Sequence, residues 1–597
     1  MVMISDLHLS IYFDFNRKKD FHKFCTQVIS IIKPSLVLAS GDLTDAIMRS
    51  YFASDQIEKE WIWYREVLNF SGVTNKTLWL DIRGNHDMFN IYSWQSENNY
   101  FRKYSETGSK YRRHFSYELK HNTETYTFIA VDACYHPSQK RPFNFMGWLK
   151  KDDINKLTNL SNEAKAKGSN FTIWFGHYPT SSILMPNFGL RQILNGPYLC
   201  GHYHAFIKQL YITHDNDALE IEVGDWKDHR FFRIAAIDHG LFSFNDIHLN
   251  EWPIILITNP KSALFSMSRI EPLHRIKTSS HIRALVFSIF AIQSVHVKID
   301  ESPWKEMRLS SNSLYVLEWK PERYNAGLHF ITVKAIDAKN NKQFMKQQFS
   351  IDGSKPEFSF FKKLLLRGSL QHIFKKVFFL IVFSSILPLM AFRTIHLYQK
   401  EYLFQSKESS SFVHRLFYKF CLMASLDMYA FILVAIPFYV TSGPWFIGDL
   451  VDNHFGLCFV WGLFIDGHYS PSCFTYVFGA AFVLFVNIAH TFCFAQIIYK
   501  RHEQILAKEA IDNSFKQKYL KARHVAFLII CLLHLVPISI LETSFGFKSL
   551  IFGFLFTWSF FIYAYLWLSS FKLDENDFSR IDDNIKRNGC KLKANIS

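Results

Sequence analysis

Residues 78–87 have the sequence LWLDIRGNHD, in which a short apolar run ends at once in Gly84-Asn85-His86-Asp87. The same arrangement stands at the start of the chain, where residues 2–4 precede Asp6 and His8. A run of this length that ends in glycine and polar residues is typical of a buried strand followed by a loop. The sequence therefore predicts strands that deliver carboxylate, amide and imidazole groups to loops at their ends.

Three further apolar runs end in the same way. Residues 35–40 precede Gly41-Asp42-Leu43-Thr44-Asp45, residues 171–175 precede Gly176-His177, and residues 198–200 precede Gly201-His202-Tyr203-His204. One such motif recurs by accident, but five in order along a chain are specific. Carboxylate, carboxamide and imidazole ligands suit two hard or borderline cations held close together, and glycine lets the backbone turn tightly beside them. The pattern indicates a two-metal centre.

These five blocks resemble those of the calcineurin-like metallophosphoesterase family, which are Asp-x-His, Gly-Asp-x-x-Asp, Gly-Asn-His-Asp or -Glu, Gly-His and Gly-His-x-His. The resemblance covers residues 1 to about 250. It implies an α/β fold over residues 1–250, the αββα metallophosphoesterase sandwich. It also implies hydrolysis of a phosphomonoester or phosphodiester by a hydroxide that bridges two divalent metal ions, with Mn, Fe, Zn and Mg all open as the metal.

The resemblance implies a role for each matching residue. Asp6, His8 and His204 would hold the first metal, Asn85, His177 and His202 the second, and Asp42 would bridge the two. His86 matches the family histidine that contacts the phosphate and assists the leaving group; its alternative is a structural hydrogen bond. Asp45 and Asp87 match positions that orient their neighbours.

Asp225, Asp238 and His239 lie close to these blocks in sequence. They either shape substrate access or are structural residues at strand ends, and the sequence favours neither role. They are therefore left out of the predicted site.

Residues 253–352 alternate apolar and polar positions in short runs, as at 283–288 and 327–333. About 100 residues with this spacing predict a β-sandwich. Trp319 and the closing Ile351-Asp352-Gly353 are similar to an immunoglobulin-like module in a membrane-bound branch of the same family. No residue there indicates chemistry, so a spacer or docking role is expected, and residues 353–376 are predicted to be a linker.

Five apolar stretches in residues 377–568 predict about five transmembrane helices, since a membrane helix needs about 20 mostly apolar residues. The stretches are Val377 to Phe392, Phe420 to Val440, Cys473 to Tyr499, Val525 to Leu541 and Leu550 to Leu568. Buried helices of a large soluble domain are the alternative, but five Phe-rich runs so close together disfavour it. The run Phe455 to Ile465 is too short to cross a membrane and is expected to be re-entrant or interfacial.

Asp427, His490 and His534 fall within these stretches, at membrane depth. An ionisable group there raises the hypothesis of a transport path. No run of paired charges accompanies them, so hydrogen bonds between packed helices are the favoured interpretation.

Basic residues alternate between the loops of this region. Residues 393–419 carry five Lys or Arg, residues 441–472 none and residues 500–523 seven. Because such residues stay on the cytoplasmic side, the basic tail at 569–597 is predicted to be cytoplasmic and the phosphoesterase domain lumenal or extracellular. The net charge of +15 is thus mainly a topology signal, and no nucleic-acid partner is expected.

Glycosylation sequons favour a multi-pass glycoprotein of the secretory pathway. They begin at Asn69, Asn75, Asn159 and Asn170, all in the N-terminal half. No signal peptide precedes Asp6, so either residues are missing before Met1 or the domain faces the cytoplasm. The cysteines show no paired spacing, so no disulfide framework is predicted.

Composition excludes a disordered or fibrous chain, since charged residues make up 20% and the mean hydropathy is zero. A membrane-anchored phosphoesterase is the leading hypothesis, with a phosphoester substrate, lipid-linked or not, and membrane lipids as expected partners. A receptor or scaffold that binds a phosphorylated ligand or lipid without turnover is the alternative, which an intact His86 and a complete ligand set disfavour. A transporter with a regulatory ectodomain is a third hypothesis.

Overall fold

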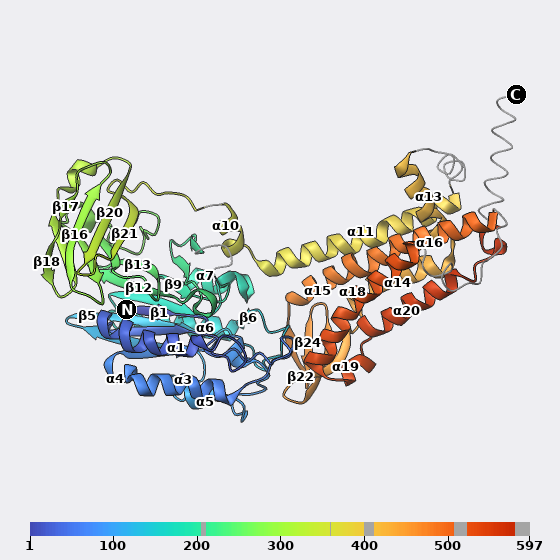
Figure 1. Cartoon of the computed structure of the whole chain (residues 1–597), viewed down its shortest axis with the longest axis horizontal. Helices are drawn as coiled ribbons and strands as arrows, with labels where there is room; N and C mark the ends of the chain where they lie inside the picture. Colours follow the sequence, from blue (N-terminus) through green and yellow to red (C-terminus); the bar gives the residue numbers. More distant parts are fainter. Residues whose placement is uncertain (205–209, 359, 399–410, 507–521, 580–597) are drawn as a thin grey trace. The chain divides into compact units, whose positions relative to one another are not determined.

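The computed structural model describes residues 1–204, 210–358, 360–398, 411–506 and 522–579. The chain divides into two compact units, Met1–Leu370 and Gln371–Ser597 (Figure 1). The first unit holds the predicted metal ligands and the second holds the apolar helices, so each is described by itself.

Two sheets form the centre of the first unit. Their strand orders are β13-β12-β1-β2-β3 and β10-β11-β9-β7-β5-β4. Strands β1, β2 and β3 are parallel to one another, as are β5, β7 and β9. The bounds are β1 Val2–Ile4, β2 Leu36–Ser40, β3 Leu78–Ile82, β12 Phe231–Asp238 and β13 Leu241–His248 in the first sheet, and β4 Phe115–His121, β5 Glu124–Val131, β7 Phe171–Gly176, β9 Tyr198–Cys200, β10 Tyr211–Thr213 and β11 Leu219–Glu222 in the second.

The alternation of side chains along these strands decides which layer covers each face. Leu38 of β2 packs between the two sheets with Phe175 of β7. Its neighbour Val37 points the other way, into a core shared with helices α1 (Asn16–Lys23) and α3 (Glu58–Ser71). Trp174, on the outer face of the second sheet, packs with α6 (Lys151–Ala166) and α7 (Gly189–Ile193). Strands buried on both faces are apolar throughout, and the predicted αββα sandwich is confirmed.

The predicted immunoglobulin-like β-sandwich is also confirmed. Its two four-stranded sheets have the orders β14-β15-β19-β18 and β17-β16-β20-β21. Buried and half-buried positions alternate along β15, as expected for a strand with one face in the core. The bounds are β14 Ile254–Asn259, β15 His281–Phe287, β16 Ile292–Ile299, β17 Lys305–Glu306, β18 Arg308–Ser311, β19 Leu314–Glu318, β20 Leu328–Asp337 and β21 Lys342–Ser350.

The segment predicted to be a linker contains helix α10 (Phe360–Arg367). Arg191 of α7 donates hydrogen bonds to the carbonyls of Leu366 and Arg367, at 2.8 and 2.7 Å. Leu366 is fully buried beside Leu210 and Ile212. This part of the segment is therefore packed on the phosphoesterase domain.

Three helical segments of the second unit are long and apolar enough to cross a membrane: Leu370–Ile395, Phe474–Leu506 and Ala522–Phe545, in the part of the chain that the structure describes. They correspond to α11 (Leu370–Tyr398), to α15 (Phe474–Phe482) continued through a π-turn into α16 (Ala489–Leu506), and to α18 (Ala522–Phe545). Helices α13 (Phe412–Ser425) and α14 (Asp427–Ser442) meet the same criterion only as a pair, bent by 97°. The fifth stretch forms α20 (Phe556–Ser570), of 15 residues. The protein is a membrane protein.

A four-stranded antiparallel sheet interrupts the helices of this unit. It consists of β22 (Phe446–Val451), β23 (His454–Phe459), β24 (Gly462–Ile465) and β25 (His468–Pro471). The run Phe455 to Ile465, expected to be re-entrant or interfacial, thus supplies two strands of a hairpin. Asp452-Asn453 and Asp466-Gly467 have positive φ, as two-residue hairpin turns require, and these dipeptides are the sequence signal for the sheet.

The ionisable residues of the predicted spans contact neighbouring helices, although the ring of His490 does so by stacking and its Nδ1 bonds the Val486 carbonyl four residues before it. Nε2 of His534 on α18 lies 3.3 Å from the Ser559 hydroxyl of α20. His490 of α16 stacks on the ring of Tyr563 of α20, with the ring centroids 4.0 Å apart. Asp427 is the first residue of α14 and forms an ion pair with Arg393 of α11.

Candidate metal centre

The predicted ligands lie in the loops that follow β1, β2, β3, β7 and β9, where the carboxyl ends of parallel strands meet. Several of these loops have unusual backbone conformations. Left-handed φ angles occur at Asp6 (56°), His8 (44°), Asp42 (50°), His202 (83°) and His204 (53°). Residues other than glycine adopt this region rarely, and such residues cluster at functional sites.

Two glycines allow the loops to approach one another. A Cβ atom on Gly84 would lie 2.2 Å from Oδ1 of Asp42, and one on Gly201 would lie 2.4 Å from Oδ2 of Asp6. Both distances are far inside van der Waals contact. The glycines of the sequence blocks therefore make room for the carboxylates of other blocks.

Asp6, His8, Asp42 and His204 form a first group, whose ligand atoms all lie within 4.8 Å of one another. The Nε2 atoms of His8 and His204 are 3.0 Å apart, and Nε2 of His204 lies 3.3 Å from Oδ1 of Asp6. Oδ2 of Asp42 lies 3.5 Å from Nε2 of His8. The His204 side chain is 27% exposed, so this group reaches solvent.

Asp42, His177 and His202 form a second group, whose ligand atoms also lie within 4.8 Å of one another, and Asn85 lies beside it. Nε2 of His177 lies 3.3 Å from Oδ2 of Asp42, 3.1 Å from Oδ1 of Asn85 and 3.1 Å from Nδ1 of His202. Oδ2 of Asp42 is close to both groups. The structure thus brings together every predicted ligand and places Asp42 between the two sets.

Hydrogen bonds outside the centre fix which ring nitrogen faces it. Nδ1 of His8 lies 2.9 Å from Oδ1 of Asp45, so Nε2 points inward. Nδ1 of His177 lies 3.0 Å from the carbonyl of Ser40, with the same result. Such contacts hold metal-binding histidines in one orientation. Asp45 thus has the orienting position expected of it.

The titratable groups of the centre shift one another's pKa values. Burial opposes ionisation of Asp42, yet the neighbouring His177 and His86 hold the pKa of this carboxyl well below its usual range. Burial disfavours protonation of His177, but attraction to Asp42 outweighs it and raises the pKa of His177 to about 9. Burial lowers the pKa values of His8 and His202 well below the usual range, which keeps both rings neutral. His8 and His202 are thus neutral donors beside an ionised Asp42, the states in which these groups bind metals, whereas His177 must lose its proton when a metal binds.

The residues present fit two divalent cations. Nε2 of His8 and Nε2 of His204 approach to 3.0 Å, as do Nε2 of His177 and Nδ1 of His202 to 3.1 Å. Each pair of ring nitrogens lies beside carboxylate oxygens. Each cation would therefore have a mixed nitrogen and oxygen donor set, which suits Mn, Fe and Zn and, less well, Mg.

His86 lies at the edge of the centre that faces solvent. Its backbone N–H donates to Oδ1 of Asp42 at 2.9 Å, and its Nδ1–H donates to the carbonyl of Asp45. Its Nε2 lies 3.9 Å from Oδ2 of Asp42, and the side chain is 14% exposed, against 2% for Asp42. Nε2 is therefore the atom through which His86 can contact a molecule bound at the centre.

Asp87 and Arg83 hold the block around His86 in place. The carboxylate of Asp87 accepts hydrogen bonds from the backbone of Leu43, Thr44 and Gly84, at 2.9 to 3.0 Å, which ties the loops after β2 and β3 together. Arg83 forms a fully buried ion pair with Asp132 at 2.6 Å. Arg83 stands in the opening sequence block, but its partner lies 49 residues away, a distance that no motif indicates.

The loop after β11 contributes residues that the predicted site omitted. Asp225 is buried, and its carboxylate lies within 4.8 Å of ligand atoms of His204 and Asp228. The backbone N–H of Lys227 donates to the carbonyl of Asp6 at 2.9 Å. Burial lowers the pKa of His86, although the neighbouring carboxylates of Asp42 and Asp45 oppose this shift.

Asp238 and His239 lie outside the centre. Asp238 accepts hydrogen bonds from Arg283 and Thr258 of the immunoglobulin-like domain, both at 2.7 Å. His239 is exposed and pairs with Asp238. Asp238 therefore joins the two domains of the first unit.

Three family models match the chain. Residues 1–206 match the calcineurin-like phosphoesterase, residues 249–355 the TMEM62 Ig-like domain and residues 375–552 the TMEM62 C-terminal domain. Mouse transmembrane protein 62 is 36% identical over 93% of this chain and 86% of its own length. An Arabidopsis thaliana protein named "Putative metallophosphoesterase" is 30% identical over 51% of this chain and 48% of its own. Among solved structures, GAP50, the anchor in the inner membrane complex of Plasmodium, aligns with a TM-score of 0.29 and 11% identity, over 42% of this chain and 84% of that one.

The branch of the family expected from the sequence is thus the transmembrane protein 62 type, with all three parts in the expected order. A relative of this similarity, matched over nearly the whole of both chains, shares the family of the protein. The chain therefore belongs to the transmembrane protein 62 family and carries a calcineurin-like phosphoesterase domain.

Proposed function

We propose that the protein is a membrane-anchored, metal-dependent hydrolase of a phosphomonoester or phosphodiester. The observation that carries the proposal is the position of Asp42, whose Oδ2 lies 3.5 Å from Nε2 of His8 and 3.3 Å from Nε2 of His177. One carboxylate oxygen is thus shared by two complete sets of donors. Two divalent cations, when bound, supply the Lewis acidity that activates water and neutralises the phosphoryl oxygens.

The chain contributes orientation and proton transfer. Asp45 and the Ser40 carbonyl fix His8 and His177, so the Nε2 atoms of both rings already face the centre. Nδ1 of His86 is a donor to the Asp45 carbonyl, which leaves Nε2 to face a phosphoester. An anionic phosphoester favours the protonated ring, and the imidazolium then donates from Nε2 to the leaving oxygen.

The loop charges support a lumenal or extracellular phosphoesterase domain and a cytoplasmic C-terminal tail. The structure is compatible with glycosylation, because the acceptor side chains of Asn69, Asn75, Asn159 and Asn170 are all exposed. Glycosidase treatment of the protein from eukaryotic cells should increase its gel mobility, and replacement of the four asparagines should remove the change. An unchanged mobility, with a protease-protected loop at 500–523, would contradict this orientation.

The proposed activity is tested with the purified full-length protein in detergent. With added Mn²⁺ it should hydrolyse p-nitrophenyl phosphate or its bis ester, and Asp42→Asn should abolish turnover. Asp238→Asn is the matched control, since it removes an ion-paired carboxylate outside the centre. If no phosphoester is cleaved while inorganic phosphate still binds to the metal-loaded protein, the protein is a module that binds a phosphorylated ligand without turnover, and the proposed activity is wrong.

A further inference from the structure

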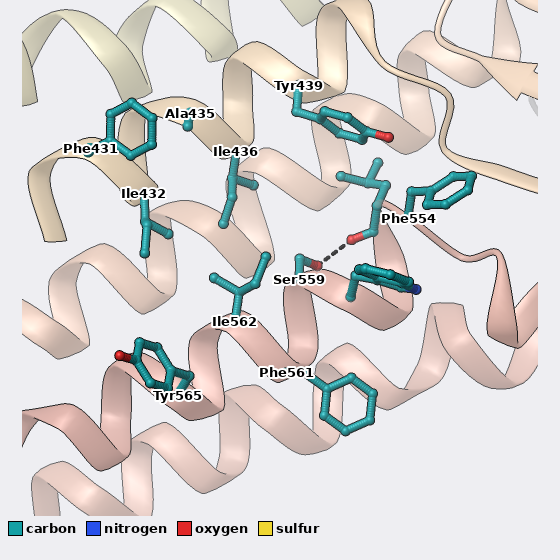
Figure 2. Close-up of a pocket in the computed structure, with 12 residues that line it drawn as sticks. Phe431, Ile432, Ala435, Ile436, Tyr439, Phe554, Ser559, Phe561, Ile562 and Tyr565 are labelled. Carbon is teal, nitrogen blue, oxygen red and sulfur yellow. Dashed lines mark hydrogen bonds between the residues drawn. The ribbon is translucent and has the colours of Figure 1, made fainter. Parts of the chain in front are cut away.

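Two grooves flank helix α14 in the membrane unit. One lies between α14 and α20 and has a volume of about 830 Å³, and the other lies between α11 and α14 with about 800 Å³. Figure 2 shows the first, in which Ile432 and Ile436 of α14 face Ile562 of α20. Its serine, Ser559, donates to the carbonyl of Leu555 in its own helix. The α14–α20 groove is therefore lined mainly by apolar groups, and none of its lining residues is charged.

The α11–α14 groove is apolar along its sides as well. Met390 of α11 and Val434 and Phe438 of α14 line it, and it extends from Asp427, the first residue of α14, to Ser442, the last. A helix of this length rises about 24 Å, at 1.5 Å per residue. The hydroxyl of Thr394 donates to the carbonyl of Met390 at 3.0 Å, and that of Ser442 donates to the carbonyl of Phe438 at 3.1 Å. These hydroxyls are satisfied within their own helices.

One end of the α11–α14 groove carries both charges of an ion pair. Nη1 of Arg393 donates to the carbonyls of Ala424 and Ser425, at 2.7 and 2.8 Å, and Nη2 donates to Oδ1 of Asp427. Within the described residues, Nε of Arg393 and Oδ2 of Asp427 have no hydrogen-bond partner. The Arg393 side chain is 30% exposed and that of Asp427 is 77% exposed. The groove end thus offers an N–H donor and a carboxylate acceptor side by side.

We propose that the α11–α14 groove binds a phospholipid of the phosphatidylethanolamine class. An acyl chain lies along the apolar walls, the phosphate accepts a hydrogen bond from Nε of Arg393, and the primary ammonium donates to Oδ2 of Asp427. The head group carries one negative and one positive charge, and so does the ion pair. The phosphate can therefore pair with Arg393 while the ammonium pairs with Asp427. The inference is independent of the proposed phosphoesterase activity.

The charge pattern disfavours phosphatidylglycerol and phosphatidylcholine. A phosphatidylglycerol head has no ammonium, so it offers no donor to Oδ2 of Asp427, and its net negative charge is repelled by this carboxylate. A phosphatidylcholine head has a cation but no N–H, so it cannot donate to Oδ2. A hydrogen bond to a charged group corresponds to about tenfold in affinity or more. Phosphatidylethanolamine should therefore bind about tenfold more tightly than phosphatidylglycerol, with phosphatidylcholine between them.

Native mass spectrometry of the full-length protein tests the proposal. The detergent-purified protein is titrated with the three phospholipids, all with the same acyl chains, and the lipid-bound fraction is measured after release from the micelle. The expected result is retention in the order phosphatidylethanolamine, phosphatidylcholine, phosphatidylglycerol. Equal retention of all three, or a preference for phosphatidylglycerol, would overturn the proposal without any variant.

Three variants locate the site. Asp427→Asn keeps the fold contact with Arg393 through an amide oxygen but removes the partner of the ammonium, so the roughly tenfold preference over phosphatidylglycerol should disappear. Val434→Trp fills the α11–α14 groove and should reduce retention of all three lipids. Ile562→Trp fills only the α14–α20 groove and should leave both affinity and preference unchanged. A loss of retention with Ile562→Trp equal to that with Val434→Trp would show unspecific annular lipid and contradict the assignment.

Discussion

Nε2 of His8 and Nε2 of His204 lie 3.0 Å apart, although 196 residues separate them in the chain. The two rings lie in loops that follow β1 and β9, which belong to different sheets of the sandwich, and Asp42 lies beside His8 on the loop after β2. The centre is thus assembled by the packing of one sheet on the other. A metal bound by these ligands should therefore also hold the two sheets together at this edge.

Metal binding should stabilise the phosphoesterase domain. A ligand that binds only the folded state at 100 times its Kd contributes about 2.7 kcal/mol. Addition of Mn²⁺ to EDTA-treated protein should therefore raise the first transition in differential scanning fluorimetry by several degrees. His202→Ala should lower this shift, whereas His239→Ala, at an exposed histidine outside the centre, should keep it. A shift of equal size in both variants would place the metal elsewhere.

His86→Ala should reduce kcat by about 10²- to 10⁴-fold, the usual contribution of a general acid. Because its Nε2 lies 3.9 Å from the nearest oxygen of Asp42 and its Nδ1 is bound to a carbonyl, the metal content should stay unchanged. Metal analysis together with initial rates separates these effects. Loss of metal in this variant would make His86 a ligand and contradict its role with the phosphoester.

The cluster of candidate metal ligands could be predicted because each sequence block is local. A strand of three to six residues ends in its ligands, so hydropathy and glycine mark the position without knowledge of the fold. That the blocks converge follows from parallel pairing of the strands. The Arg83–Asp132 ion pair and the approach of Lys227 to Asp6 depend instead on how β5 and β12 pack beside the ligand strands. Such contacts have no local pattern.

In the membrane half, hydropathy predicts the apolar stretches but not the points at which a helix breaks. An apolar window joins residues 420–440 into one span, but Leu426 has φ −82° and ψ 109°, and this extended residue bends the chain by 97°. Neither proline nor glycine stands at the bend, so no breaker signal exists in the sequence. Arg393 donates to the last carbonyls of α13 and stabilises the bend from another helix. A contact of this kind is visible only in the folded chain.

Glu60 should make the stability of the phosphoesterase domain depend on pH. Its carboxyl accepts hydrogen bonds from the backbone of Ile11 and Ala46, at 3.0 and 2.9 Å, and burial raises its pKa to about 8. An unfolded glutamate titrates near 4.3, so between these values the folded state binds the additional proton. This contribution to stability is present below about pH 4.3 and is lost as the pH rises to about 8. Glu60→Gln cannot ionise, so it should flatten the decline in melting temperature over this range, even though its amide nitrogen cannot accept one of the two backbone hydrogen bonds. Glu66→Gln, in a partly exposed pair with Lys18, should leave the decline unchanged.

Gly84→Ala should abolish metal binding without unfolding the sandwich. The new Cβ would lie 2.2 Å from Oδ1 and 2.6 Å from the backbone nitrogen of Asp42, so the loop after β2 must shift. A shift of this kind separates the shared carboxylate from His8 and His177, and a displacement of 1 Å in such a centre costs about 10²-fold in activity. Gly168→Ala is the matched control, because Gly168 has φ 77° but nothing within 4 Å of its Cβ position. It carries only the backbone strain of about 1 kcal/mol, so it should lower the melting temperature slightly and keep its metal. If Gly84→Ala bound Mn²⁺ as tightly as Gly168→Ala, the close approach of the two loops would not be needed for the centre.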